Sequence, residues 1–139
     1  MYERSLGLLL LRVGVGLVFF WHGFNKVLTL GLTESFFMHL GLPAWVAIAI
    51  AWLELVGGLA IVLGLMTRLF AFLFGIEMLV ALFLTGITRG WQQHELELLL
   101  MATSFALVYM GSGRISLWRM ECQYCGAFAC RLEDCPKRK

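Results

Sequence analysis

Residues 44–66 read AWVAIAIAWLELVGGLAIVLGLM, and Glu54 is the one charged side chain among them. If this segment is helical, every face of the helix is apolar, whereas a helix on the surface of a soluble protein keeps a polar face. About 20 such residues are needed to cross the hydrocarbon core of a bilayer. The segment therefore predicts a transmembrane helix.

Comparable apolar runs lie on both sides of this segment. Of the 139 residues, 60% are hydrophobic and 14% are charged, which favours a membrane protein over a soluble domain. Short connections between the runs make sequential helices antiparallel neighbours. The fourth run is the least apolar, because Glu95 and Glu97 shorten it. We predict an all-α, integral membrane, antiparallel four-helix bundle with spans at residues 6–28, 44–66, 69–87 and 91–110.

The connection between the first two spans contains a short helix of its own. Thr33 is a suitable helix cap, and Gly41 with Pro43 is typical of a helix end. We expect residues 34–40 to form a helix that lies at the outer interface of the membrane. Residues 1–118 then form the bundle, and residues 119–139 form a cysteine-rich, basic tail.

Positive charges are distributed unevenly between the two ends of the predicted spans. Lys and Arg near span ends favour the cytoplasmic side of a membrane. One end has only Lys26 and Arg89, and the other has Arg4, Arg68, Arg114, Arg119 and residues 137–139. This bias predicts a multi-pass protein of the inner (plasma) membrane with both termini in the cytoplasm.

Several ionisable residues lie inside the predicted spans, where each charge costs about 2.5–3.5 kcal/mol on insertion scales. His22 and Lys26 are four residues apart, so they share one face of the first helix, with Asn25 adjacent. Depth along the helices places Glu54 within reach of His22, Lys26 near Glu95, and Arg12 near Glu77. We predict an outward-opening polar cavity that could hold a quinone or an anion, with His22, Asn25, Lys26, Glu54 and Glu95 as its binding residues. The alternative is that these charges are paired and only fix the register of the helices.

The tail contains all four cysteines of the chain, at Cys122, Cys125, Cys130 and Cys135. The spacing Cys-x2-Cys-x4-Cys-x4-Cys equals that of a zinc knuckle in which Cys130 replaces the histidine. Four thiolates satisfy a tetrahedral zinc ion, so we predict a zinc site. Dithiol exchange at Cys122-x-x-Cys125, an iron–sulfur cluster, a pair of disulfides and a disordered tail are the alternatives.

The order of motifs along residues 5–118 resembles the DoxX family of small four-helix membrane proteins. The motifs are Trp21-His22-Gly23-x-x-Lys26, Glu54-Leu-Val-Gly57-Gly58, Gly64-Leu-Met-Thr67-Arg68, Gly90-Trp91 with Glu95, and Gly111-x-Gly113-Arg114-x-Ser116-Leu117. Relatives in that family include the membrane subunit of a thiosulfate:quinone oxidoreductase and a membrane partner of redox-defence enzymes. The resemblance implies a subunit of a membrane redox system that is linked to quinone or to thiol and sulfur chemistry.

Three functions remain open at this point, and the sequence does not decide whether the chain is itself an enzyme. In a quinone-linked redox subunit, His22 and Lys26 would hydrogen-bond a quinone oxygen, and Glu54 would carry a proton. In a non-enzymatic scaffold, the metal-bound tail would recruit a soluble redox enzyme. A carrier of soft metal ions ranks last because no cysteine precedes Cys122. We expect the bilayer and a soluble redox enzyme as partners, a homo-oligomer is compatible with the sequence, and the net charge of +2 gives no reason to expect nucleic acid.

Overall fold

The computed structural model describes residues 2–89 and 94–112, and every regular element in these ranges is a helix. This confirms the predicted all-α class. The predicted zinc site and the Gly90-Trp91 motif lie outside the described residues. The helices are α1 (Tyr2–Leu28), α2 (Leu30–His39), α3 (Ala44–Leu63), α4 (Thr67–Arg89) and α5 (Glu95–Met110).

Three of the helices are long and apolar enough to cross a membrane, at Leu6–Leu28, Ala44–Leu63 and Thr67–Leu84. The first range is the predicted first span. The predicted fourth span corresponds to α5, whose 16 residues cover about 24 Å at 1.5 Å per residue. That length is below the roughly 30 Å of a hydrocarbon core. Glu95 and Glu97 occupy the first turn of α5, which leaves its apolar part shorter still.

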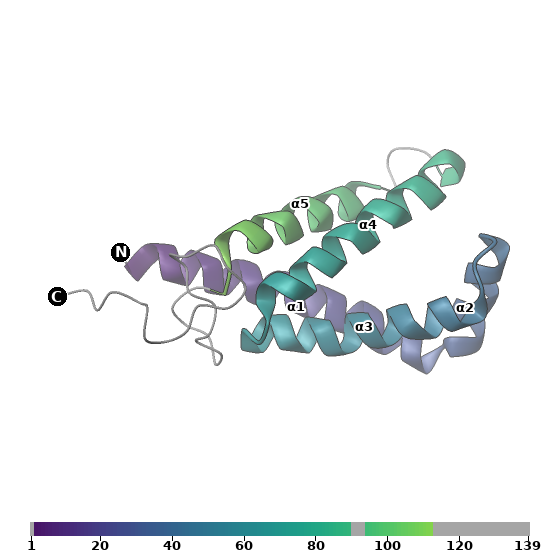
Figure 1. The fold of residues 1–139 in the computed structure, drawn as a ribbon, viewed down its shortest axis with the longest axis horizontal. Helices are drawn as coiled ribbons and strands as arrows, with labels where there is room; N and C mark the ends of the chain where they lie inside the picture. The colour runs from purple at the N-terminus through teal and green to yellow at the C-terminus, as the bar shows by residue number, and fades with distance from the viewer. Residues whose placement is uncertain (1, 90–93, 113–139) are drawn as a thin grey trace.

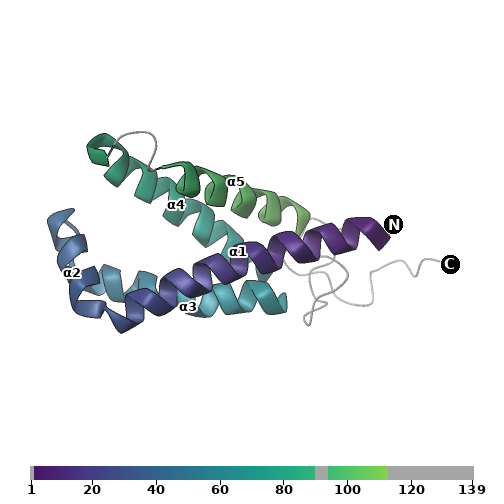
Figure 2. The same ribbon diagram turned by 180° about the vertical axis from the view of Figure 1, so that it is seen from behind.

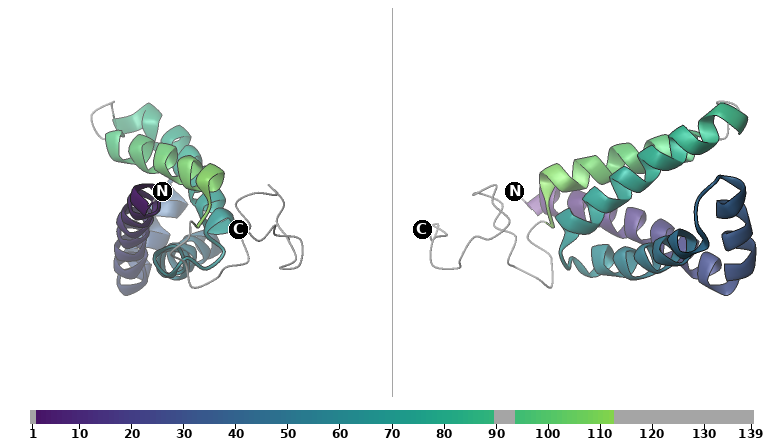
Figure 3. Two further views of the ribbon diagram at one scale, coloured as in Figure 1. Left: turned by 90° about the vertical axis from the view of Figure 1, so that its left-hand side faces the viewer. Right: turned by 45° about the vertical axis from the view of Figure 1, so that its right-hand side comes forward.

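The helices associate as two antiparallel pairs. α1 packs chiefly against α3, and α4 packs chiefly against α5, with fewer contacts between the pairs. Figures 1 and 2 show that the pairs approach each other at the end of the molecule that contains the N-terminus, and diverge toward α2. The two views of Figure 3 show the same divergence, with α2 at the wide end. We call the narrow end the closed end and the α2 end the open end.

Glycines bring the backbones of α1 and α3 together. A Cβ atom at Gly16 would lie 2.8 Å from the carbonyl oxygen of Gly58, and a Cβ at Gly23 would collide with the backbone of Leu55. Small residues permit such close approach where lipid gives helices no hydrophobic drive to associate. Gly64 has a different role, because it follows α3 in the left-handed conformation, with a φ of +77°, and ends the helix.

Aromatic stacking joins the two helix pairs in the middle of the molecule. The rings of Phe19 on α1 and Phe74 on α4 are stacked, with centroids 3.8 Å apart and planes inclined by 12°. Both side chains are almost completely buried, together with Ile61 and Leu107. This cluster fills the space between the pairs on the side of the closed end.

Two connecting segments, the turn between α3 and α4 and the short helix α2, differ in their bounds from the predicted ones. The predicted spans 44–66 and 69–87 place their connection at residues 67–68, but the turn lies at 64–66, because Gly64 takes the left-handed conformation and Thr67 already begins α4. The predicted helix at 34–40 is longer and begins at Leu30. Thr33 is therefore inside α2 and not its cap, and its hydroxyl donates to the carbonyl of Thr29 at 3.1 Å. The predicted end is confirmed, because Gly41 follows the helix with a φ of +79°.

Candidate ligand-binding cavity

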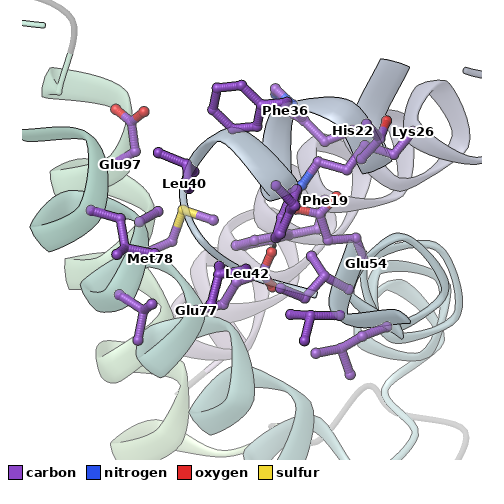
Figure 4. A pocket seen from close by; sticks show the side chains of 18 of the residues that line it. Phe19, His22, Lys26, Phe36, Leu40, Leu42, Glu54, Glu77, Met78 and Glu97 are labelled. Atoms are coloured by element: carbon purple, nitrogen blue, oxygen red, sulfur yellow. Dashed lines mark hydrogen bonds and ion pairs between the residues drawn. The ribbon is translucent and has the colours of Figure 1, made fainter. Parts of the chain in front are cut away.

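A cavity of about 770 Å³ lies between the two helix pairs at the open end, and all five helices contribute to its walls. This volume is within the range of about 300–1,000 Å³ that is typical of ligand sites. Aliphatic and aromatic side chains form most of the wall, including Phe36 of α2, Leu40 directly after α2 and Met78 of α4 (Figure 4). Phe19 also lines the cavity, so the Phe19–Phe74 stack separates it from the closed end.

Three charged side chains form a cluster in the wall of this cavity. The ammonium nitrogen Nζ of Lys26 lies 2.6 Å from Oε1 of Glu54 and 3.9 Å from Oε1 of Glu77. The carboxylates are buried, with 2% of the Glu54 side chain and 9% of the Glu77 side chain exposed, whereas 28% of Lys26 is exposed. The cluster therefore combines two buried carboxylates with one ammonium group.

The packing of α1 on α3 explains why Lys26 meets Glu54. Gly23 lies directly against the backbone of Glu54 and Leu55. Lys26 follows Gly23 by three residues, which is slightly less than one helical turn, and so lies near the same face of α1. The flexible lysine side chain then reaches the carboxylate with little further constraint. We call the close backbone contact of α1 with α3 at Gly16, Gly23 and Gly58 the glycine seam. The glycine seam thus sets the position of the ion pair.

One oxygen of each carboxylate in the cluster receives no hydrogen bond from an N–H group or a hydroxyl of the described residues, and the two carboxyl groups are hydrogen-bond neighbours of each other. These atoms are Oε2 of Glu54 and Oε2 of Glu77, and both are buried. Buried polar atoms in native proteins almost always have a partner, and an unpaired one requires an explanation such as a water, an ion or a ligand. With two carboxylates and one ammonium, the cluster can accept a proton or further hydrogen-bond donors from the cavity.

The predicted binding residues separate into two groups in the structure. His22, Lys26 and Glu54 line the cavity together. Asn25 and Glu95 are exposed and do not line it. The Nδ2 group of Asn25 donates to the carbonyl oxygen of Trp21 on its own helix at 3.0 Å. Asn25 adjoins Lys26 in sequence, but the helix rotates it by about 100° to another face.

The predicted ion pairs are wrong. Lys26 pairs with Glu54 and not with Glu95, because the glycine seam brings α3 closer to α1 than α5. Glu77 lies beside Lys26. Arg12 instead donates from Nη1 to the carbonyl oxygen of Ser112 at 2.6 Å, at the closed end.

Two cavity residues, Glu77 and Glu97, were absent from the predicted site. Glu97 lines the cavity from α5, and Glu95 does not. The sequence contained a signal for this difference, because Glu97 precedes the buried residues Leu100, Ser104 and Leu107 at helical spacing. No comparable signal placed Glu77 in the site, because its depth along the helix matched the depth of Arg12 equally well.

A second polar group lies beside the cavity at the start of α5. His94 is 3% exposed, and its Nδ1 lies 4.0 Å from Oε2 of Glu97. Oε2 of Glu97 and both ring nitrogens of His94 are buried without a hydrogen-bond partner in the part of the chain that the structure describes. In the same part of the chain, no group of three or more His, Cys, Asp or Glu residues is placed to hold a metal ion.

These features define a helical membrane protein with a ligand-sized cavity between two helix pairs. The model of the DoxX family matches residues 7–86, which is more than half of the chain, and the protein belongs to this family. A relative in Bacillus subtilis strain 168, named "Putative oxidoreductase CatD", is 36% identical over 114 residues. The alignment covers 81% of this chain and 85% of that protein. No solved structure matches the chain.

Proposed function

We propose that this DoxX protein is a subunit of a membrane redox system and binds a lipid-soluble quinone in the cavity at its open end. The observation that carries the proposal is the combination of apolar walls with a buried Lys26–Glu54–Glu77 cluster. The name of the Bacillus subtilis relative, an oxidoreductase, supports a redox role.

The residues of the cavity fit both parts of such a ligand. The aromatic and aliphatic walls suit an apolar ring and its hydrocarbon substituents. The ammonium group of Lys26 has three N–H donors, and the unpartnered oxygens of Glu54 and Glu77 are acceptors. A few polar groups that converge in a mostly apolar pocket are what orients a small ligand. A bound quinone would supply two-electron, two-proton chemistry at this position.

Each side chain of the cluster has a distinct task in this proposal. Lys26 donates a hydrogen bond to a ligand oxygen and at the same time keeps Glu54 in place through the 2.6 Å contact. Glu54 and Glu77 take up and release a proton at their Oε2 atoms, which accept hydrogen bonds when ionised and donate one when protonated. The Phe19–Phe74 stack excludes water from the closed end, so that protons enter and leave at the open end. His22, which is exposed and lines the cavity, is the residue placed to exchange them with solvent.

The cavity can be tested by filling it. Leu40→Trp at the C-terminal end of α2, directly after its last residue, places a large ring in the cavity wall. Met38→Trp adds the same ring to an exposed position of α2 that does not line the cavity. We expect decylubiquinone to bind the purified protein in detergent, as measured by isothermal titration calorimetry. Leu40→Trp should weaken binding at least tenfold, and Met38→Trp should leave it unchanged. Absence of binding to the wild-type protein, or equal binding by both variants, contradicts the proposal.

We further propose that the cysteine tail binds zinc through Cys122, Cys125, Cys130 and Cys135 and recruits a soluble redox enzyme. The C-terminal end of α5 lies at the closed end (Figure 1), and Ser112, the last described residue, accepts a hydrogen bond from Arg12 of α1. This position favours recruitment of a partner over direct contact between the thiols and the cavity ligand. Metal analysis should give one zinc per chain, and deletion of residues 119–139 should abolish capture of the partner while the bundle stays folded. A metal-free tail that still captures the partner would exclude this role.

A further inference from the structure

We infer that the cavity opens into the hydrocarbon core of the bilayer between α2 and α4, and that the hydrocarbon chain of the bound quinone occupies this opening. The inference rests on the proposed quinone site and deepens it, because it assigns the orientation of the ligand and the residues that contact its chain. The ligand class is then a quinone with a long hydrocarbon chain, and a chain-free ring lacks part of the recognition.

The first step is to locate the edge of the cavity. Side chains deep in the wall, such as Met78 and Leu100, are buried, so strong exposure of a lining residue marks the place where the cavity opens. Six of the described lining residues are exposed, and five of these are apolar. The six are His22 of α1, Leu32 and Phe36 of α2, Ile76 and Val80 of α4, and Leu96 of α5. We call Leu32, Phe36, Ile76 and Val80 the apolar mouth.

The two helices at the apolar mouth are not packed on each other. α2 packs chiefly on α3 and has few contacts with either helix of the other pair. No residue of α2 is buried. Figures 1 and 2 both show α2 separated from the end of α4 that lies at the open end. The packing of the described helices therefore leaves the cavity open from the side between α2 and α4.

The α4 side of the apolar mouth lies at the depth of the membrane hydrocarbon. Ile76 and Val80 belong to the range Thr67–Leu84, which is long and apolar enough to cross a membrane. They are four residues apart, so they share one face of α4. The exposed apolar surface of a membrane-spanning helix faces lipid chains and not water. At this side the cavity therefore communicates with lipid.

The apolar mouth adjoins the charged cluster. Glu77 directly follows Ile76, and Val80 comes three residues later, a rise of about 4.5 Å along the helix. A quinone ring that contacts Lys26 and Glu77 consequently has the mouth at its edge. A chain on that ring passes outward between α2 and α4 and stays among apolar groups, so binding does not transfer the chain into water.

The other directions from the cluster suit a chain less well. Toward the closed end, the stacked and buried rings of Phe19 and Phe74 fill the space between the helix pairs. On α1 the exposed lining residue is His22, whose imidazole favours the passage of water and protons. The two kinds of opening thus divide the work, with protons at His22 and the hydrocarbon chain at the apolar mouth.

The first test locates the chain on the wild-type protein. The probe is a decylubiquinone analogue with a diazirine in the middle of its chain, photo-activated on the purified full-length protein in detergent. Labelled positions are identified by mass spectrometry. We expect labels in residues 30–39 of α2 and in residues 76–84 of α4, and excess decylubiquinone should remove them. Absence of competed labels from either helix would overturn the inference, and calorimetry with decylubiquinone shows separately whether the quinone site exists.

The second test separates the chain from the ring. Val80→Trp adds a large ring at the apolar mouth, and Leu79→Trp adds it to the neighbouring exposed position that does not line the cavity. The ligands are decylubiquinone and ubiquinone-0, which has the same ring without the chain. Val80→Trp should weaken binding of decylubiquinone at least tenfold and of ubiquinone-0 less than twofold. Leu79→Trp should change neither affinity.

Affinities are measured by calorimetry, directly and by competition with decylubiquinone. Each is expressed relative to the wild type, which cancels the partition of the quinones into detergent. Equal weakening of both quinones by Val80→Trp, no weakening of either, or the same effect of Leu79→Trp would overturn the inference while the quinone site stands. If the wild type binds neither quinone, the proposed function fails as well. Thermal unfolding followed by circular dichroism verifies that each variant is folded.

Discussion

The closed and open ends of this bundle each contain charged side chains, and the partners of these side chains differ between the two ends. At the closed end, Arg12 is 3% exposed and donates to the carbonyl oxygen of Ser112 at 2.6 Å. At the open end, Lys26 contacts two carboxylates in the wall of a cavity, and Oε2 of each receives no N–H or O–H donor from the described residues. The first charge ties the end of α5 to α1, and the second group leaves hydrogen-bonding capacity unused.

This contrast shows how buried charges in one membrane protein can be sorted by role. A charge whose contacts lie within a packed region fixes the positions of helices. A charge with spare hydrogen-bonding capacity beside a ligand-sized space is a candidate for binding and proton transfer. The divergence of the two helix pairs creates this space only at the open end.

The largest effect is expected from removal of the ammonium group at the open end. Lys26→Met leaves Glu54 and Glu77 buried without a counter-ion, and loss of one partner of a buried pair costs about 3–5 kcal/mol. The free energy of unfolding in detergent, measured by titration with sodium dodecyl sulfate, should fall by this amount. The double variant Lys26→Met, Glu54→Leu should recover part of the loss, and a double variant less stable than the single one would contradict this account.

A smaller effect is expected from the matching change at the closed end. Arg12→Met removes the hydrogen bond to the carbonyl of Ser112, and bonds to charged groups contribute about 1.5–3 kcal/mol. The same unfolding titration measures the loss. Because Arg12 is separated from the cavity by the Phe19–Phe74 stack, quinone affinity should be unchanged. If Arg12→Met weakened quinone binding as strongly as Leu40→Trp, the division into two ends would be wrong.

The smallest change in stability is expected from a substitution in the glycine seam, where α1 contacts α3. Gly23→Ala adds a methyl group against the backbone of Leu55, and such overpacking costs about 1–3 kcal/mol. Gly14→Ala on the same helix adds the same group where nothing lies within 4 Å, so it should be neutral or stabilise the helix by up to about 1 kcal/mol. Thermal unfolding of the two variants should separate them. Equal behaviour would show that α1 and α3 do not approach as closely as the structure indicates.

Much of the fold could be predicted from the sequence, because apolar run length is a local property. The range 6–28 is a helix long and apolar enough to cross a membrane, as predicted, and the start of α3 at Ala44 is where the hydropathy placed it. The errors lie at the ends of helices, where the conformation of a single residue can determine the last helical position. Gly64 ends α3 three residues before the predicted limit, and α2 starts at Leu30, four residues before the predicted start.

The site was predicted less completely, because depth in the membrane does not define the neighbours of a helix. The distance along each helix correctly put His22, Lys26 and Glu54 near one end of the bundle. It did not show which helices touch, so Lys26 was paired with Glu95 although α1 packs on α3. The structure places Glu97, and not Glu95, in the cavity wall, a difference that the spacing to Leu100 could have indicated.

The sequence by itself determined that this is a helical membrane protein of the DoxX family with charged groups buried in its spans, because length, hydropathy and motif order are written along the chain. Only the tertiary structure decided that Lys26 meets Glu54 and Glu77, and that a cavity of about 770 Å³ lies beside them. The reason is physical. Hydropathy requires only that a helix be in the membrane, whereas close backbone contact at glycines selects which helices pair and where the pairs separate.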